Sequence, residues 1–176
     1  MKFGARTLGR ALAVQSLYGA ACTGNDPLTV LDGVVRMGGL GLLRYRFDDE
    51  QVPREYAVIS CTPSTRSNAM RYARKLLEGV SRHAPMIDPL IESHLIGWTR
   101  ERVGRLEWAI LQVAACEMLC LKLVDPPIAI DQAITLAKWF AQEETARFIN
   151  GVLDAVARHA KTKKDTDETT NHESDA

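Results

Sequence analysis

The sequence of 176 residues predicts an all-α protein made of two packed helical bundles and a disordered C-terminal tail. Apolar residues recur at helical spacing along most of the chain. No segment shows the sustained alternation of apolar and polar residues that a half-buried strand requires. Hydrophobic residues make up 46% of the chain, which is enough to fill a packed interior.

The first third of the chain predicts two helices followed by an irregular connection. Residues of roughly 5–21 carry one apolar stripe, and a second helix is expected to begin near Leu28. Glycines at 38, 39 and 41 and prolines at 53 and 63 predict that a long irregular connection follows, with a short extended piece at 56–60, within an insertion of about 24–66.

The middle of the chain predicts three further helical segments. A helix is expected after Ser67, and Pro85 is expected to begin a separate short helix. A long helix follows, because a run of apolar residues is spaced as one buried stripe. These residues are Val103, Leu106, Ile110, Val113 and Leu121.

The last helices are bounded by clear local signals. Pro126 and Pro127 are expected to end the long helix and to occupy the first turn of the next, which runs to about Phe140. The final helix is expected from about Glu143, and no aliphatic or aromatic residue follows Ala160. The predicted organisation is one domain over 1–160, with bundles over about 5–97 and 98–160, and a disordered tail over 161–176.

Positive charge is concentrated at the N-terminus although the whole chain is neutral. Lysines and arginines balance acids at 22 each, but Lys2, Arg6 and Arg10 precede the first acid, Asp26. Their spacing of four residues places them along one edge of a helix. Such an edge suits phosphate groups. The alternative is an ordinary solvated helix face.

The segment 146–156, ARFINGVLDAV, predicts a cation beside an aromatic ring. Its buried stripe leaves Arg147 and Phe148 towards the flank of the helix. A guanidinium for phosphate and a ring for base stacking are what single-stranded RNA needs. The alternative is that Phe148 belongs to the core.

Acidic residues around the start of the long helix have two possible roles. Glu101 and Glu107 stand among arginines, which is typical of a surface charge network of low energy. They also suit a basic protein partner. Glu117 falls near the apolar stripe and is expected to make a structural hydrogen bond.

The sequence indicates neither an enzyme nor a cofactor or metal site. The four cysteines include no C-x-x-C pair, so reduced thiols are expected. No glycine-rich phosphate loop is present, and the histidines lack a metal-binding or triad context. No segment predicts a membrane span, and the N-terminal apolar run is expected to be a helix of a cytoplasmic protein and no export signal.

Four segments together resemble the NusB family. They are RALAVQSLYG (10–19), RLEWAILQVAACEM (105–118), IAIDQAITLAK (128–138) and RFINGVLDAVA (147–157). They occur in the order and approximate spacing of that family, from about Ala5 to Arg158 except over 24–66. The resemblance implies a fold of two packed three-helix-type bundles.

The resemblance also implies a transcription antitermination function. A protein of this kind joins NusE, a ribosomal protein, and holds single-stranded boxA RNA in ribosomal RNA leaders, which helps RNA polymerase pass terminators. By position, the RNA-facing residues it implies are Lys2, Arg6, Arg10, Gln15, Tyr18, Glu144, Arg147 and Phe148. The NusE-facing residues it implies are Glu101 and Glu107.

Departures from the family pattern keep other functions open. Thr7 and Leu8 stand where many members carry further arginines, Ala141 replaces a glycine and Trp108 a common cation. The chain could therefore be a helical protein–protein adaptor without RNA binding. It could also be a stand-alone relative of the RNA-binding domain of rRNA cytosine methyltransferases. A homodimer is possible, as in some family members.

Overall fold

The computed structural model describes residues 4–36, 61–141 and 143–172, and over these residues it contains helices and no strand. The predicted all-α class is therefore confirmed. Lys2 and residues 37–60 of the predicted irregular insertion lie outside the described residues. The α-helices are α1 (Ala5–Thr23), α2 (Pro27–Arg36), α3 (Pro63–Glu92), α4 (Arg105–Ala115), α5 (Pro126–Phe140) and α6 (Glu143–His172).

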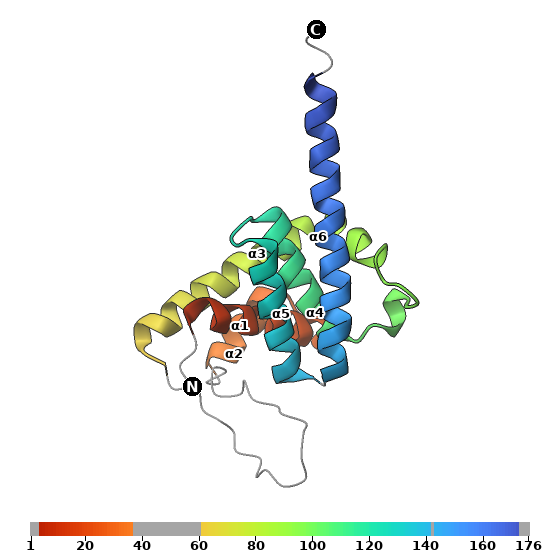
Figure 1. The fold of residues 1–176 in the computed structure, drawn as a ribbon. Coiled ribbons are helices and arrows are strands. Elements are labelled where there is room, and N and C mark those ends of the chain that lie inside the picture. The colour runs from red at the N-terminus through yellow and green to blue at the C-terminus, as the bar shows by residue number, and fades with distance from the viewer. Residues whose placement is uncertain (1–3, 37–60, 142, 173–176) are drawn as a thin grey trace.

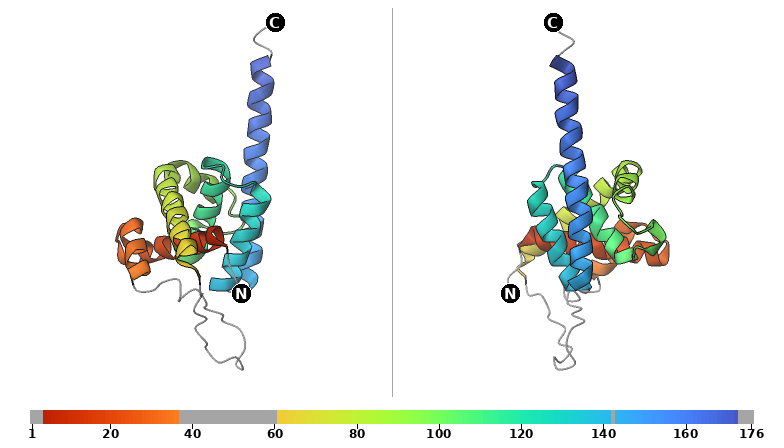
Figure 2. Two further views of the ribbon diagram at one scale, coloured as in Figure 1. Left: turned by 90° about the vertical axis from the view of Figure 1, so that its left-hand side faces the viewer. Right: turned by 45° about the vertical axis from the view of Figure 1, so that its right-hand side comes forward.

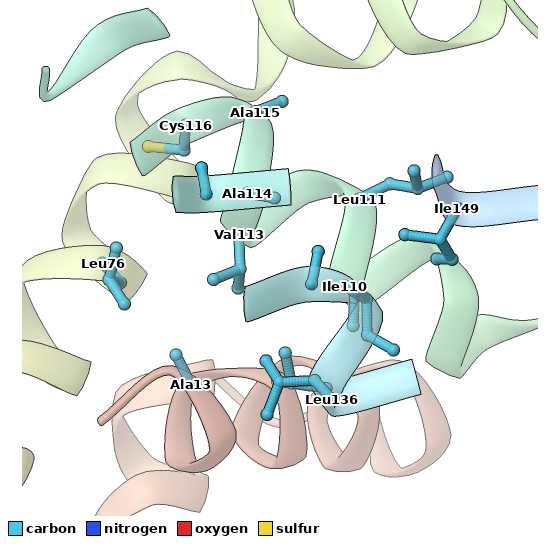
Figure 3. Close-up of a cluster of buried hydrophobic side chains, with 14 of the residues drawn as sticks. Ala13, Leu76, Ile110, Leu111, Val113, Ala114, Ala115, Cys116, Leu136 and Ile149 are labelled. Atoms are coloured by element: carbon cyan, nitrogen blue, oxygen red, sulfur yellow. The ribbon is translucent and has the colours of Figure 1, made fainter. Parts of the chain in front are cut away.

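Helix α1 passes through the centre of the molecule, and both groups of helices pack on it (Figure 1). Its residues Leu8–Val14 are buried on every side of the helix. A single hydrophobic core joins α1–α3 to α4–α6. Figure 3 shows Ala13 of α1 and Leu136 of α5 in the same cluster as Ile149 of α6.

Helix α1 and helix α3 cross at close range because Gly9 has no side chain. A Cβ on Gly9 would lie 2.8 Å from the carbonyl oxygen of Ala69 and 2.9 Å from Tyr72 Cβ. Both of those atoms belong to positions that cannot move without shifting α3. The crossing fixes the N-terminal end of α1 beside Tyr72, which matters for the site described below.

Helix α3 is a single helix, and the predicted break at Pro85 is wrong. The helix begins at Pro63, before the expected start after Ser67, and Thr62 caps it by accepting a hydrogen bond from the Thr65 amide at 3.1 Å. It continues through Pro85 and Pro89. Each proline removes one backbone hydrogen bond. An unbroken helix keeps Ile87 and Ile91 fully buried in the core, which outweighs that loss.

The predicted long helix is divided in the structure. A short 3₁₀ helix, η2 (Arg100–Arg102), precedes α4, and a π-helical turn, η3 (Cys116–Cys120), follows it. The wider π turn carries Glu117 into the interior, where it is fully buried. The later boundaries are as predicted: Pro126 begins α5, which ends at Phe140, and α6 begins at Glu143.

Helix α6 continues to His172, so residues 161–172 of the expected disordered tail are helical. Figure 1 shows this part of α6 projecting beyond the body of the molecule. Extending a helix that packing has already nucleated costs little, because each added residue closes a backbone hydrogen bond. The polar composition after Ala160 therefore does not prevent a helix over 161–172.

The described residues contain neither a candidate membrane span nor a candidate metal site. None of their helices is long and apolar enough to cross a membrane. No group of three or more histidine, cysteine, aspartate or glutamate side chains among them is placed to hold a metal ion.

Candidate nucleic-acid interface

The cationic edge predicted along α1 is not continuous in the structure. Arg6 is exposed near the start of the helix and Tyr18 near its end, while the turns between them are buried. Twelve residues separate the two positions, so they lie about 18 Å apart along the axis and about 120° apart around it. The predicted residues of α1 therefore belong to two separate surfaces.

Arg10 lies in a buried ion pair, which corrects its predicted place on the surface. Its Nε lies 2.8 Å from Glu117 Oε2, and the two side chains are only 5% and 1% exposed. Arg10 Nη1 also donates to Gln132 Oε1 at 3.2 Å. The Tyr72 hydroxyl donates to Glu117 Oε1. This network joins α1, α3, η3 and α5, and it leaves the Arg10 guanidinium with no access to a phosphate. The structural hydrogen bond expected of Glu117 is confirmed.

Tyr72 links the buried network to the exposed Arg6. Burial raises the pKa of Tyr72 well above its usual value, and the hydrogen bond to Glu117 raises it further. The tyrosine therefore stays a neutral donor. The Arg6 guanidinium carbon lies 5.8 Å from the centre of the Tyr72 ring. At that distance the ring face attracts the cation and helps to hold it at this end of α1.

A small pocket lies where the segment before α4 meets the start of α6. Its volume is about 200 Å³, below the range typical of drug-sized ligands. Phe148 and Trp98 line it with ring centres 5.7 Å apart and planes inclined at 56°. The Arg102 guanidinium carbon lies 5.3 Å from the Trp98 ring. The remaining lining residues are Val103, Gly104, Glu107, Glu144 and Thr145.

Phe148 is neither a full core residue nor a free surface residue. Its side chain is half-buried and packs against the core on one side. Its other side forms a wall of the pocket with Trp98, which is 48% exposed. A ring held in this way can stack on one planar group without leaving its place in the fold.

The pocket also contains two carboxylates that the sequence assigned to different partners. Glu144 was expected to face RNA and Glu107 to face NusE, yet both line the same pocket. Glu107 lies in the first turn of α4, where the helix dipole favours negative charge. A Cβ on Gly104 would collide with Glu107 Oε2, so the glycine leaves room for this carboxylate.

Glu101 lies outside the pocket, in η2, and is fully exposed. A hydrogen bond from its own backbone amide lowers the pKa of Glu101, and a second from the Thr99 hydroxyl acts in the same direction. The carboxylate is therefore ionised and open to solvent at neutral pH.

Tyr18 stands beside the pocket at the far end of α1. It is 44% exposed, and its hydrogen bond with Cys22 raises the pKa of Tyr18. The charges of Arg105 and Glu107 act on the same phenol, with opposite signs. Arg105 Nη1 also lies 3.7 Å from Cys22 Sγ. Glu107 is thus shared between Tyr18 and the aromatic pocket.

Two other residues predicted to face RNA, Arg147 and Gln15, lie outside the pocket. Arg147 is 80% exposed and lies 3.7 Å from Glu143, a surface pair of little energy that leaves the guanidinium free to bind another anion. Gln15 is half-buried, and its Oε1 accepts no hydrogen bond from the described residues. Neither residue lines the pocket.

Sequence reasoning did not single out Trp98, Arg102 or Gly104. A tryptophan that follows a glycine in a segment rich in arginine was the available signal. Gly97 adopts a φ of 74°, which favours glycine and ends the preceding turn, and Trp98 is then left largely outside the core.

Comparison with known proteins gives consistent matches. A sequence profile described as the NusB family matches residues 43–158. A transcription antitermination protein NusB from Nitratiruptor sp. is 41% identical over 96 residues, which are 54% of this chain and 68% of that protein. One from Sulfurovum sp. is 36% identical over 124 residues, which are 70% of this chain and 95% of that protein.

Solved structures show the same similarity. The solution structure of NusB from Aquifex aeolicus is 26% identical, with a TM-score of 0.67 over 92% of this chain and 93% of that one. A crystal structure of antitermination factors NusB and NusE in complex with dsRNA is 25% identical. Its TM-score is 0.67, over 88% of this chain and 97% of that one.

Proposed function

The chain belongs to the NusB family, and from that premise we propose that it binds boxA RNA of ribosomal RNA leaders together with NusE. In this role it acts in the cytoplasm as a transcription antitermination factor and supports the processivity of RNA polymerase. The family is not enzymatic, and the proposal accordingly involves no chemical step.

The observation that carries the proposal is the aromatic pocket. Phe148 and Trp98 offer ring faces to one unstacked base, and Glu107 and Glu144 offer acceptors for its amino or imino hydrogens. Arg147 and Arg102 stand nearby as cations for the backbone. A single strand fits this combination better than a duplex, whose bases are already stacked and paired.

NusE is the proposed source of further positive charge. The burial of Arg10 leaves few exposed cations on α1, so a basic partner would add to the affinity for RNA. Glu101 supports such a partner, because it is an ionised, fully exposed carboxylate next to the pocket. Glu107 would serve both partners, since it lines the pocket with Phe148 and its charge also acts on the Tyr18 phenol.

One observation favours a second candidate function. With Arg10 held inside by Glu117, the chain has a weaker cationic edge than its sequence suggests. A helical protein–protein adaptor that binds NusE and not RNA would need no such edge. The two functions differ in whether RNA binds to the complex at all.

The test is the affinity of the full chain for boxA RNA and for a scrambled RNA of equal length, with and without NusE. We expect boxA to bind more tightly than the scrambled strand, and more tightly still with NusE. The Phe148→Leu variant should lose on the order of 1–3 kcal/mol of RNA affinity, because the stacking surface is removed while most of the core contact stays.

The matched control is Phe140→Leu, which changes another half-buried phenylalanine, outside the pocket. It should leave RNA affinity unchanged, and the melting temperatures of both variants show whether either has simply unfolded. Equal binding of boxA and scrambled RNA, in the presence and absence of NusE, would disprove the proposed boxA function. Binding of NusE with no binding of either RNA would leave the adaptor.

A further inference from the structure

The outer face of α3 carries a row of cations that the proposed site does not use. Residues 63–82 contain five cations and one acid, Glu78, although the charges of the whole chain balance. Arg71, Lys75 and Arg82 lie within about 40° of one another around the helix, since each residue turns it by about 100°. All three are exposed, on the side away from the core.

These three cations form no ion pair among the described residues. Arg74, further around the helix, is the α3 cation that does pair, with Asp32 of α2 at 2.9 Å. Arg71 donates to Asn68 Oδ1 at 3.0 Å, but that neutral acceptor leaves its charge uncompensated. A row of uncompensated cations favours a polyanion, because each phosphate that it neutralises releases counterions.

The chemistry of this face favours an RNA backbone over a protein or a membrane. Among the described residues, none of the large exposed hydrophobic side chains lies within residues 63–82, and Met86 is the first one beyond. Protein interfaces have an apolar centre, and helices that lie on membranes need an apolar face. Arg71 and Arg82 are about 16 Å apart along the helix, so together they can contact several nucleotides of one RNA strand.

The row also adjoins the cation that remains exposed on α1. Arg6 lies over the ring of Tyr72, the neighbour of Arg71 in sequence, and Gly9 brings α1 against α3 at the same place. Figure 2 shows the first turns of α3, in yellow, along the outside of the molecule and beside the start of α1. Arg6 therefore lies beside the same turn of α3 that carries Arg71.

We propose that Arg71, Lys75 and Arg82 form a second RNA-backbone site, which holds phosphates of the strand that flanks the boxA element. The proposal rests on the proposed function for where the RNA comes from. The site reads no base, because cations alone on a smooth helix face distinguish charge and not sequence.

The test compares a short boxA RNA with the same RNA lengthened by an oligouridine arm at either end. We expect the arm to tighten binding to the full chain. The slope of the logarithm of the binding constant against the logarithm of the salt concentration should steepen by about 2, because each of three phosphates contributes about 0.7. The triple variant Arg71→Gln/Lys75→Gln/Arg82→Gln should lose this gain and bind the short RNA as the unchanged protein does.

The control is Lys138→Gln/Arg158→Gln/Lys161→Gln, which removes the same charge from exposed positions of α5 and α6 and should keep the gain. The inference is overturned if the arm adds nothing, or if the α3 variant keeps the gain. Failure of all boxA binding would instead refute the proposed function. In that case oligouridine alone tests the inference, because its binding must weaken in the α3 variant and not in the control.

Discussion

The guanidinium of Arg10 is held inside the protein by a carboxylate from η3, more than a hundred residues further along the chain. Glu117 accepts from Arg10 Nε and from the Tyr72 hydroxyl, and Gln132 accepts from Arg10 Nη1. A buried pair of charges is tolerated only when such partners replace the lost water. Each member of the network therefore depends on the others.

Breaking this pair should cost stability before it affects RNA binding. We expect Arg10→Met to lower the free energy of unfolding by about 3–5 kcal/mol, because the Glu117 charge is left buried and unpaired. Urea denaturation measures the loss. Arg6→Met is the control: its side chain is exposed, so stability should change by less than about 0.5 kcal/mol while RNA affinity falls. An Arg10→Met protein as stable as the unchanged one would show that the pair is unimportant.

Tyr72 should make stability fall in alkaline solution. Its pKa in the folded protein is raised above the usual value of 10.0, so the folded state holds the phenol proton more tightly than the unfolded state does. The resulting contribution of Tyr72 to the free energy of unfolding is complete below about pH 10 and is lost as the pH rises further. Urea denaturation at about pH 8 and about pH 10.5 should show a smaller decline for Tyr72→Phe than for the unchanged protein. Equal declines would contradict the role of Tyr72.

At the scale of elements, the start of α4 determines how the pocket is built. Gly104 is the N-terminal cap of α4, with extended backbone angles that any residue can adopt. Its importance is spatial, because Glu107 folds back over it. The glycine therefore governs the position of a carboxylate in the pocket that both residues line.

Replacing Gly104 with alanine should move Glu107 and leave the helix intact. The added Cβ collides with the end of a flexible side chain, and replacing glycine by the less favoured alanine at a helix N-cap costs on the order of 1 kcal/mol. We expect NusE and boxA affinity to fall about as far as in Glu107→Ala, with little further loss in the double variant. Additive losses in a double-mutant cycle would separate the two residues. The melting temperature serves as the control for folding.

The elements differ in how far the sequence predicted them. The starts of α5 and α6 follow from local signals, namely the prolines at 126 and 127 and the acids at 143 and 144. The continuity of α3 through Pro85 depends on what Ile87 and Ile91 contact, which local pattern does not contain. The π turn at Cys116–Cys120 likewise exists where Glu117 meets Arg10, a contact between distant segments.

The site shows the same division. The position of Phe148 on the flank of α6 could be predicted from helical spacing, whereas Glu144 was implied only by the family resemblance. The burial of Arg10 could not, since residues 8–14 of α1 are covered by helices that follow much later in the chain. Helical periodicity assumes one buried face, and α1 is buried on all faces through its middle turns.

At the scale of the whole molecule, α6 has a packed part and a projecting part. Its last buried residue is Val156, and the helix continues to His172. We expect removal of residues 161–176 to leave the midpoint of thermal unfolding unchanged, because none of the side chains described after Ala157 belongs to the core. Removal from residue 155 onward should lower it sharply, since Val156 is fully buried. Circular dichroism during heating measures both. A large loss for the shorter deletion would show that the projecting helix is packed.

The position of α1 also governs when the protein can become complete during its synthesis. The hydrogen-bond partners of Arg10 and Thr7 come 107 and 125 residues later. A chain growing from its N-terminus therefore makes its central helix first, and part of that helix stays uncovered until α4 and α5 emerge. Long-range contacts of this kind slow folding and prolong the exposure of apolar surface to chaperones and to aggregation. A chain whose synthesis stops before α4 would therefore not be partly active. Its exposed α1 would instead mark it as incomplete to chaperones and proteases.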